Sequence, residues 1–181
     1  MKHRHHRISV IGTSGSGKTT VAAEIAERLN IRHVELDALH WKPGWREAPL
    51  DEFRRRVDET TSGESWVVDG NYGKVRDIVW GKAETVVWLD LPFSVVFWRV
   101  LWRTISRIFT GEELWSGNRE NLGSLIGPDS MPLWVLKTYW RRKKEIPELL
   151  RRAEYSHLAV IRLRSSREIR EWLGSLSPGH R

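Results

Sequence analysis

Short apolar runs alternate along this chain with stretches in which apolar side chains recur every three or four positions. The runs are rich in β-branched residues and predict buried strands over residues 7–12, 33–37, 65–70, 85–91 and 157–163. The periodic stretches predict helices over residues 18–29, 50–60, 74–80, 92–109, 132–152 and 165–174. Strands that alternate with helices in this way indicate an α/β domain with a mainly parallel sheet.

Some stretches carry more specific local signals. Ser165, followed three residues later by Glu168, predicts a capping box that opens the last helix. Pro147 is expected to kink or divide the helix in which it falls. Residues 38–49 are typical of a Pro- and Trp-rich loop, and the Gly-rich polar residues 110–130 predict an irregular, mobile segment.

The length of 181 residues fits one domain, spanning residues 1–181. The apolar runs are too short for a membrane span, and no apolar signal core precedes the first strand. The chain has no cysteine, which excludes disulfides and cysteine-ligated zinc. We therefore expect a cytoplasmic protein that does not contact a membrane.

The stretch GTSGSGKTT follows the first predicted strand and fits the pattern G-x-x-x-x-G-K-[ST] through Gly12, Gly17, Lys18 and Thr19. Glycines let successive backbone N–H groups face one anion, and the following helix adds its positive end. Lys18 is expected to reach the β- and γ-phosphates of ATP, and the Thr19 hydroxyl to ligate Mg²⁺. The predicted nucleotide cradle comprises Gly12, Thr13, Ser14, Gly15, Ser16, Gly17, Lys18, Thr19 and Thr20.

Three carboxylates fall at the carboxyl ends of predicted strands, which is the edge where open α/β sheets bind ligands. Asp69 is the candidate on the metal side, beside Mg²⁺. Asp37 is the candidate that orients or deprotonates an acceptor hydroxyl. Asp90, which precedes Leu-Pro, fits either a site residue or a helix N-cap.

Phosphoryl transfer also needs cations over the transferring group. Arg99 and Arg103 lie four residues apart on one face of a predicted helix, and Arg119 lies in the Gly-rich segment beyond it. That segment, carrying its arginine, could close over the phosphates and exclude water. Arg76 is a candidate for holding an acceptor anion.

Five motifs give the chain a resemblance to the nucleoside and nucleotide kinase-like P-loop proteins, which include adenylate and shikimate kinases. The chain most resembles the small adenylate kinase-like group known as DNA topology modulation proteins. The motifs are GTSGSGKTT (12–20), ELDALHWKPGW (35–45), VVDGNYGKVRD (67–77), WLDLP (88–92) and LWSGNRE (114–120).

The resemblance implies a P-loop NTPase fold, a three-layer α/β/α sandwich whose five-stranded parallel sheet has the order 2-3-1-4-5. It implies ATP and Mg²⁺ as cofactors and an adenine pocket near Arg103 and residues 164–167. The candidates taken from the residues themselves make up the expected catalytic set of Lys18, Asp37, Asp69, Arg103 and Arg119. Adenylate kinases place an acceptor-binding arginine earlier than Arg76, and they carry a longer lid than the short one expected here over residues 107–130.

Two function classes remain open from the sequence. One is a kinase for a small molecule or nucleotide, whose acceptor would contact Asp37, Trp41, Asn71, Tyr72 and Arg76. Trp41 and its neighbour Trp45 either stack on a planar acceptor or pin their loop to the core.

The other class is a nucleotide-dependent nucleic-acid-binding or regulatory ATPase. The net charge of +7 and a pI of about 10.0 fit polyanions, although basic side chains also cover ordinary solvated surfaces. No helix-turn-helix, zinc or RNA-recognition signature accompanies the charge, and no guanine-reading motif supports a GTPase. The assembly is expected to be a monomer or a homodimer.

Overall fold

A central parallel sheet organises the molecule. The structure is a computed structural model that describes residues 6–120, 123, 125 and 130–176. The sheet has the order β2-β5-β1-β6-β7. Its strands are β1 (Arg7–Gly12), β2 (Arg32–Glu35), β5 (Trp66–Asp69), β6 (Thr85–Leu89) and β7 (Ala159–Leu163). The predicted order 2-3-1-4-5 is confirmed, because β3 and β4 form a separate two-stranded hairpin.

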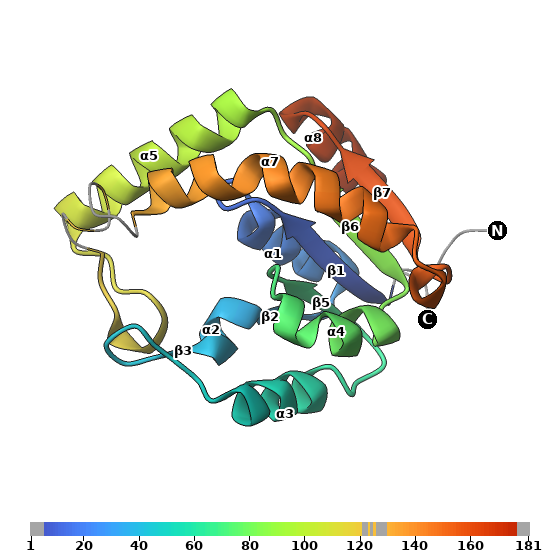
Figure 1. The fold of residues 1–181 in the computed structure, drawn as a ribbon. Helices are drawn as coiled ribbons and strands as arrows, with labels where there is room; N and C mark the ends of the chain where they lie inside the picture. Colours follow the sequence, from blue (N-terminus) through green and yellow to red (C-terminus); the bar gives the residue numbers. More distant parts are fainter. Residues whose placement is uncertain (1–5, 121–122, 124, 126–129, 177–181) are drawn as a thin grey trace.

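Helices cover both faces of this sheet (Figure 1). The helices are α1 (Lys18–Leu29), α2 (Leu36–His40), α3 (Leu50–Thr60), α4 (Arg76–Lys82), α5 (Phe93–Thr110), α7 (Met131–Leu150) and α8 (Ser166–Ser175). Three single 3₁₀ turns are η1 (Gly73–Val75), η2 (Trp115–Gly117) and η3 (Ala153–Tyr155). The predicted three-layer α/β/α sandwich is confirmed.

Alternating side chains on β1 divide the core into two clusters. Ile11 joins the cluster beneath α3 and α4, whereas Ile8 and Val10 join the cluster beneath α1, α5 and α8. The long helix α7 contributes Ile146 to the first cluster and Val135 to the second. Because all three β1 residues are almost completely buried, the phosphate loop that follows β1 starts from a rigid strand end.

The main departure from the predicted elements follows β2. This strand stops at Glu35 rather than at residue 37, because the chain turns there into the short helix α2. The predicted loop over residues 38–49 contains the end of α2 and a hairpin of β3 (Trp41–Lys42) and β4 (Arg46–Glu47). Asp37 therefore lies in the first turn of a helix, not at a strand end.

Other local predictions have mixed outcomes. The capping box is confirmed, since the Ser165 hydroxyl accepts a hydrogen bond of 3.1 Å from the Glu168 N–H. Of the two alternatives for Pro147, a kink or a division of its helix, the division is wrong: α7 continues to Leu150, and Ile146 and Leu149 pack in the core.

The segment between α5 and α7 is described only in part. Its first part contains η2 and an isolated antiparallel bridge between Glu113 and Arg119. Residues 121–122, 124 and 126–129 of the predicted lid lie outside the described residues. Within the described ranges, no helix is both long and apolar enough to cross a bilayer.

Candidate functional site

The phosphate loop connects β1 to α1 in the conformation that its glycines allow. Gly15 and Gly17 have φ angles of 83° and 89°, a region that other residues rarely adopt. A Cβ atom on Gly15 would lie 2.4 Å from Val100 Cγ2 on α5, so only glycine fits at this point. The Ser16 N–H donates to the Thr13 carbonyl at 3.0 Å and closes the loop above the N-terminus of α1.

Lys18 lies in the first turn of α1, and its Nζ donates to the Thr13 carbonyl at 3.3 Å. Burial lowers the pKa of Lys18 from 10.5 to about 8, against the opposing effect of Asp37 and Asp69. Arg142 and Arg103 lower this pKa further. The nearby carboxylates therefore do not offset the burial of the Lys18 ammonium, and an anion such as a phosphate group bound in the loop would do so.

Asp69 ends β5 directly beside α1. Its carboxylate accepts a hydrogen bond of 2.6 Å from the Thr19 hydroxyl. Its other oxygen lies 3.2 Å from Nε2 of His33, a residue of β2 that the sequence analysis did not select. Asp69 is buried, so these two contacts fix its carboxylate at the edge of the phosphate loop. No group of three or more His, Asp or Glu residues in the described part of the chain is arranged to hold a metal ion.

A second polar group lies across the cavity, on α2 and in the turn after β5. Asp37 accepts a hydrogen bond from the Tyr72 hydroxyl. Burial, followed by the charge of Asp37, raises the pKa of Tyr72 well above its ordinary value, so the phenol stays protonated. His40 is buried against the Tyr72 ring at 4.6 Å, and this burial lowers the pKa of His40. Asp37 is therefore held by a donor that does not ionise.

Cations from α5 and α7 line the side of the cavity opposite α2. Arg99 donates to the Ser16 carbonyl at 3.5 Å and to the Ser166 hydroxyl at 3.0 Å. Arg103 is half-buried, its Nε has no hydrogen-bond partner among the residues that the structure describes, and burial lowers its pKa. Burial likewise lowers the pKa of Arg142, which α7 contributes. Neither Arg103 nor Arg142 forms an ion pair with a described residue, so both can receive an anionic ligand.

Arg142 is the main residue that the sequence analysis missed. It lies within the basic run WRRKK, where nothing distinguishes it from Arg141. Only the packing of α7 against α5 determines which of the two side chains faces the cavity.

Three predicted residues lie elsewhere. The Arg76 guanidinium lies 5.3 Å from the centre of the Trp80 ring and does not line the cavity. Arg119 is exposed and pairs with Glu113 at 3.6 Å. Asp90 is buried in an ion pair with Arg162, which is a structural contact away from the cavity.

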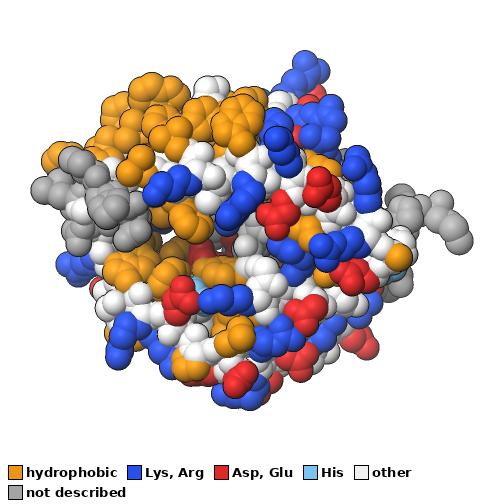
Figure 2. All heavy atoms as spheres, in the orientation of Figure 1, with side chains coloured by type: hydrophobic (Ala, Val, Ile, Leu, Met, Phe, Trp, Pro, Cys, Tyr) orange, Lys and Arg blue, Asp and Glu red, His pale blue; other side chains and the backbone are white. Residues whose placement is uncertain are grey.

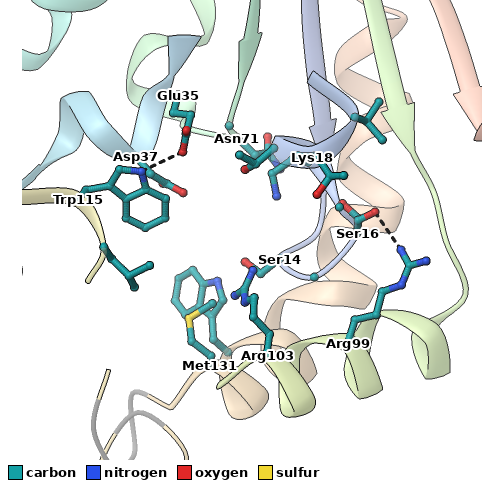
Figure 3. A pocket seen from close by; sticks show the side chains of 18 of the residues that line it. Ser14, Ser16, Lys18, Glu35, Asp37, Asn71, Arg99, Arg103, Trp115 and Met131 are labelled. Atoms are coloured by element: carbon teal, nitrogen blue, oxygen red, sulfur yellow. Dashed lines mark hydrogen bonds between the residues drawn. The ribbon is translucent and has the colours of Figure 1, made fainter. Parts of the chain in front are cut away.

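Hydrogen bonds fasten the segment after α5 to the β3–β4 hairpin. The amide of Asn118 donates to the Lys42 carbonyl at 3.0 Å and accepts from the Trp45 N–H at 2.9 Å. The Trp115 indole donates to the Glu35 carboxylate at 2.9 Å (Figure 3). We call these contacts of Asn118 and Trp115 the clasp. The clasp joins the segment after α5 to the end of β2 and to the β3–β4 hairpin.

The phosphate loop and the side chains of Asp37, Tyr72, Arg99, Arg103 and Arg142 line one cavity of about 1630 Å³. Figure 2 shows its opening as a hollow in this face of the molecule, and Figure 3 shows Lys18, Asp37, Asn71 and Arg103 around the same space. The predicted residues that line it are Ser14, Gly15, Ser16, Gly17, Lys18, Thr19, Thr20, Asp37, Trp41, Trp45, Asn71, Tyr72, Arg99 and Arg103. Asp69 reaches the cavity edge through Thr19, while Gly12 and Thr13 lie behind the loop.

Comparisons with known proteins give two kinds of likeness. No family model matches the chain. A protein of Thermococcus gammatolerans named "Putative adenylate kinase" is 33% identical over 114 residues, which are 59% of this chain and 62% of that protein. The curated proteins of this name are matched over only 39% to 62% of their own length.

Two solved structures share the fold over nearly the whole chain. Shikimate kinase from Acinetobacter baumannii, in complex with shikimate, is 18% identical over 94% of this chain and 90% of that one, with a TM-score of 0.56. A gluconokinase from Sinorhizobium meliloti is 23% identical over 95% of this chain and 93% of that one, with a TM-score of 0.51.

Proposed function

We propose that this chain, which has the fold of the P-loop kinases and resembles nucleotide kinases in sequence, is an ATP-dependent phosphotransferase acting on a small molecule or nucleotide. The observation that carries the proposal is a single cavity with two chemically distinct ends. One end is the phosphate loop and the other is the Asp37–Tyr72 pair. A cavity of about 1630 Å³ exceeds the roughly 300–1,000 Å³ of a site for one small ligand, so two substrates fit.

The phosphate loop is the donor end. Its N–H groups and Lys18 would hold the β- and γ-phosphates, and Arg99 fixes the loop by binding the Ser16 carbonyl. The Thr19 hydroxyl would ligate Mg²⁺, and Asp69, already hydrogen-bonded to Thr19, would hold a metal-bound water. Mg²⁺ supplies neutralisation of charge on the phosphate oxygens. The buried Ser16 hydroxyl, which has no hydrogen-bond partner in the described part of the chain, would be a further donor for a phosphate oxygen.

The Asp37–Tyr72 pair is the acceptor end. Asp37 would accept the proton of an acceptor hydroxyl as its oxygen bonds to the γ-phosphorus and the bond to the bridging oxygen of ADP breaks. A phosphate acceptor would need no such base. Arg103 and Arg142, which form no ion pair with a described residue, would neutralise charge on the transferring group. Trp41 and Trp45 lie 5.5 Å apart at the rim of this end and supply apolar surface for the acceptor.

The second function class, a nucleic-acid-binding ATPase, has less support. Several basic residues that could face a nucleic acid have acidic partners instead: Arg54 pairs with Asp77, Arg55 with Glu59, Arg56 with Glu52 and Lys143 with Asp90. Arg142 faces the cavity instead of solvent. Residues 1–5, which carry part of the basic N-terminus, lie outside the described residues.

ATP turnover with Mg²⁺ tests the proposal. We expect ADP release to rise by orders of magnitude with one member of a panel of nucleoside monophosphates, nucleosides and hydroxylated acids, and the Lys18→Ala variant to be inactive. We infer that the reaction takes place in the cytoplasm, where its ATP donor is available. Tight ATP binding with no acceleration by any acceptor, together with salt-dependent binding of nucleic acid, would overturn the kinase proposal in favour of the second class.

A further inference from the structure

The outer faces of α5 and α7 form an exposed aromatic surface. Trp98 and Trp102 on α5 are 55% and 65% exposed, and Trp140 on α7 is 59% exposed. Figure 2 shows the apolar side chains gathered over these two helices at the upper left. We call this surface, formed by Phe93, Phe97, Trp98, Trp102, Phe109, Leu133, Leu136 and Trp140, the aromatic face.

Ring contacts make the aromatic face continuous across the two helices. Phe93 on α5 stacks on Trp140 of α7, with ring centres 6.1 Å apart and an interplanar angle of 22°. Phe93 also stacks on Phe97 at 5.6 Å, and Phe97 meets Trp98 edge to face at 6.2 Å. These four rings therefore form one continuous cluster that spans both helices.

The charges on these helices point the other way. The only charged residues of α5 are Arg99, Arg103 and Arg107, and all three line the cavity. In the first half of α7 the only charged residue is Lys137, which also lines the cavity. An amphipathic helix of a monomer normally turns its apolar stripe inward and its charges to water. Here the opposite holds: the aromatic face contains no charged residue and faces solvent.

The size of the aromatic face exceeds what a monomer usually exposes. At up to about 250 Å² for each fully exposed aromatic side chain, Trp98, Trp102, Phe109 and Trp140 together present up to about 660 Å², and Leu133 and Leu136 add to this area. The largest apolar patch on a typical monomer is about 300–600 Å². A stable interface buries about 800 Å² on each partner.

We propose that the aromatic face is the interface of a homodimer, in which it packs against the same face of a second copy. A two-fold interface places a surface against itself, so it favours a surface without charge, because like charges would face each other. Beyond Trp140 the exposed positions of α7 become charged, at Arg141, Lys144 and Glu148, and form a polar rim. An anionic membrane surface fits less well, because it selects basic residues among the aromatic ones.

Sedimentation velocity on the full chain tests the proposal. We expect the wild-type protein at micromolar concentration to have twice the chain mass of 21.2 kDa. Trp102→Glu and Trp140→Glu, on separate helices, should each return it to 21.2 kDa. Leu50→Glu is the matched control, because Leu50 is 49% exposed but lies on α3, outside the aromatic face. This variant should stay dimeric, and circular dichroism should show all three variants folded.

A wild-type protein that stays monomeric at all concentrations would overturn the proposal, as would a dimer that survives both tryptophan substitutions. A monomer that co-sediments with phosphatidylserine vesicles would also overturn it and would assign the aromatic face to a membrane surface. Because mass is measured without nucleotide or acceptor, the result does not depend on the proposed kinase activity.

Discussion

Replacing Lys18 by methionine should stabilise the nucleotide-free protein while removing the cation of the phosphate loop. In the folded state burial lowers the pKa of Lys18 from 10.5 to about 8, and its one hydrogen bond goes to a neutral carbonyl. At about 1.36 kcal/mol for each pKa unit, the charged form costs the folded state up to about 3 kcal/mol. Because the side chain faces a cavity open to water, which screens the charge, we expect Lys18→Met to raise the free energy of unfolding by roughly 1–3 kcal/mol.

The pH dependence separates this charge effect from the added apolar surface of methionine. Below pH 8 both the folded and the unfolded wild-type chain carry the proton, so the whole cost is present. Between pH 8 and 10.5 the unfolded chain binds more protons than the folded one, and wild-type stability rises with pH. The advantage of Lys18→Met over wild type should therefore be largest at pH 7 and should shrink steadily toward pH 10.

Urea denaturation of both proteins at pH 7, 8, 9 and 10 measures this difference in the free energy of unfolding. Lys144→Met, at an exposed position of α7, is the control and should show no such trend. ATP should reverse the ranking at pH 7, because only the wild type gains stability from binding it. A difference between Lys18→Met and wild type that stays constant from pH 7 to 10 would refute the reasoning.

Three further substitutions test the metal side, the clasp and the core. Asp69→Asn keeps the shape of the side chain but removes the charge next to Thr19. Titration of ATP turnover with Mg²⁺ should therefore show an affinity for Mg²⁺ about 10–100-fold weaker. Asn118→Ala removes two hydrogen bonds of the clasp at about 1 kcal/mol each, and hydrogen–deuterium exchange at the Trp45 amide should become about tenfold faster. Arg162→Ala leaves Asp90 buried without its closest cation, and urea denaturation should show a loss of about 2 kcal/mol or more.

Each of these has a matched control. Asp58→Asn removes a carboxylate charge on the surface of α3 and should leave the Mg²⁺ dependence unchanged. Ser62→Ala removes a local hydrogen bond after α3 and should not alter exchange at the hairpin. Arg167→Ala breaks only an exposed pair on α8, with an expected loss below about 0.5 kcal/mol. If a control and its test variant behave alike, the corresponding interpretation is wrong.

The sheet and the phosphate loop were predictable because their signals are local. β-Branched runs that are buried on both faces identify the strands, and the spacing of glycine and lysine requires one backbone conformation. The five-residue helix α2 was not predictable, since it is too short to show a period. The hairpin after it has strands of only two residues. Its turn places Trp45 at a φ of 54°, a conformation that a tryptophan in the sequence does not predict.

The far side of the site depends on contacts between distant segments. Arg142 faces the cavity only because of how α7 packs on α5, and His33 meets Asp69 only because β2 and β5 are neighbours in the sheet. Arg119 was a candidate for covering the phosphates, yet the bridge between residues 113 and 119 directs it to solvent beside Glu113. Helix phase and strand neighbourhood are tertiary properties, and a single sequence contains no direct record of them.

The clasp has a consequence for the order in which substrates bind. Asn118 and Trp115 tie the segment after α5 to Lys42 and Glu35, beside the residues Trp41 and Asp37 at one end of the cavity. If the donor and the acceptor each bind only when the clasp is formed, the ligand that binds first carries the entropic cost of ordering the clasp. The second ligand then binds without that cost. Such coupling is reciprocal: ATP should raise the affinity for the acceptor by the same factor by which the acceptor raises the affinity for ATP.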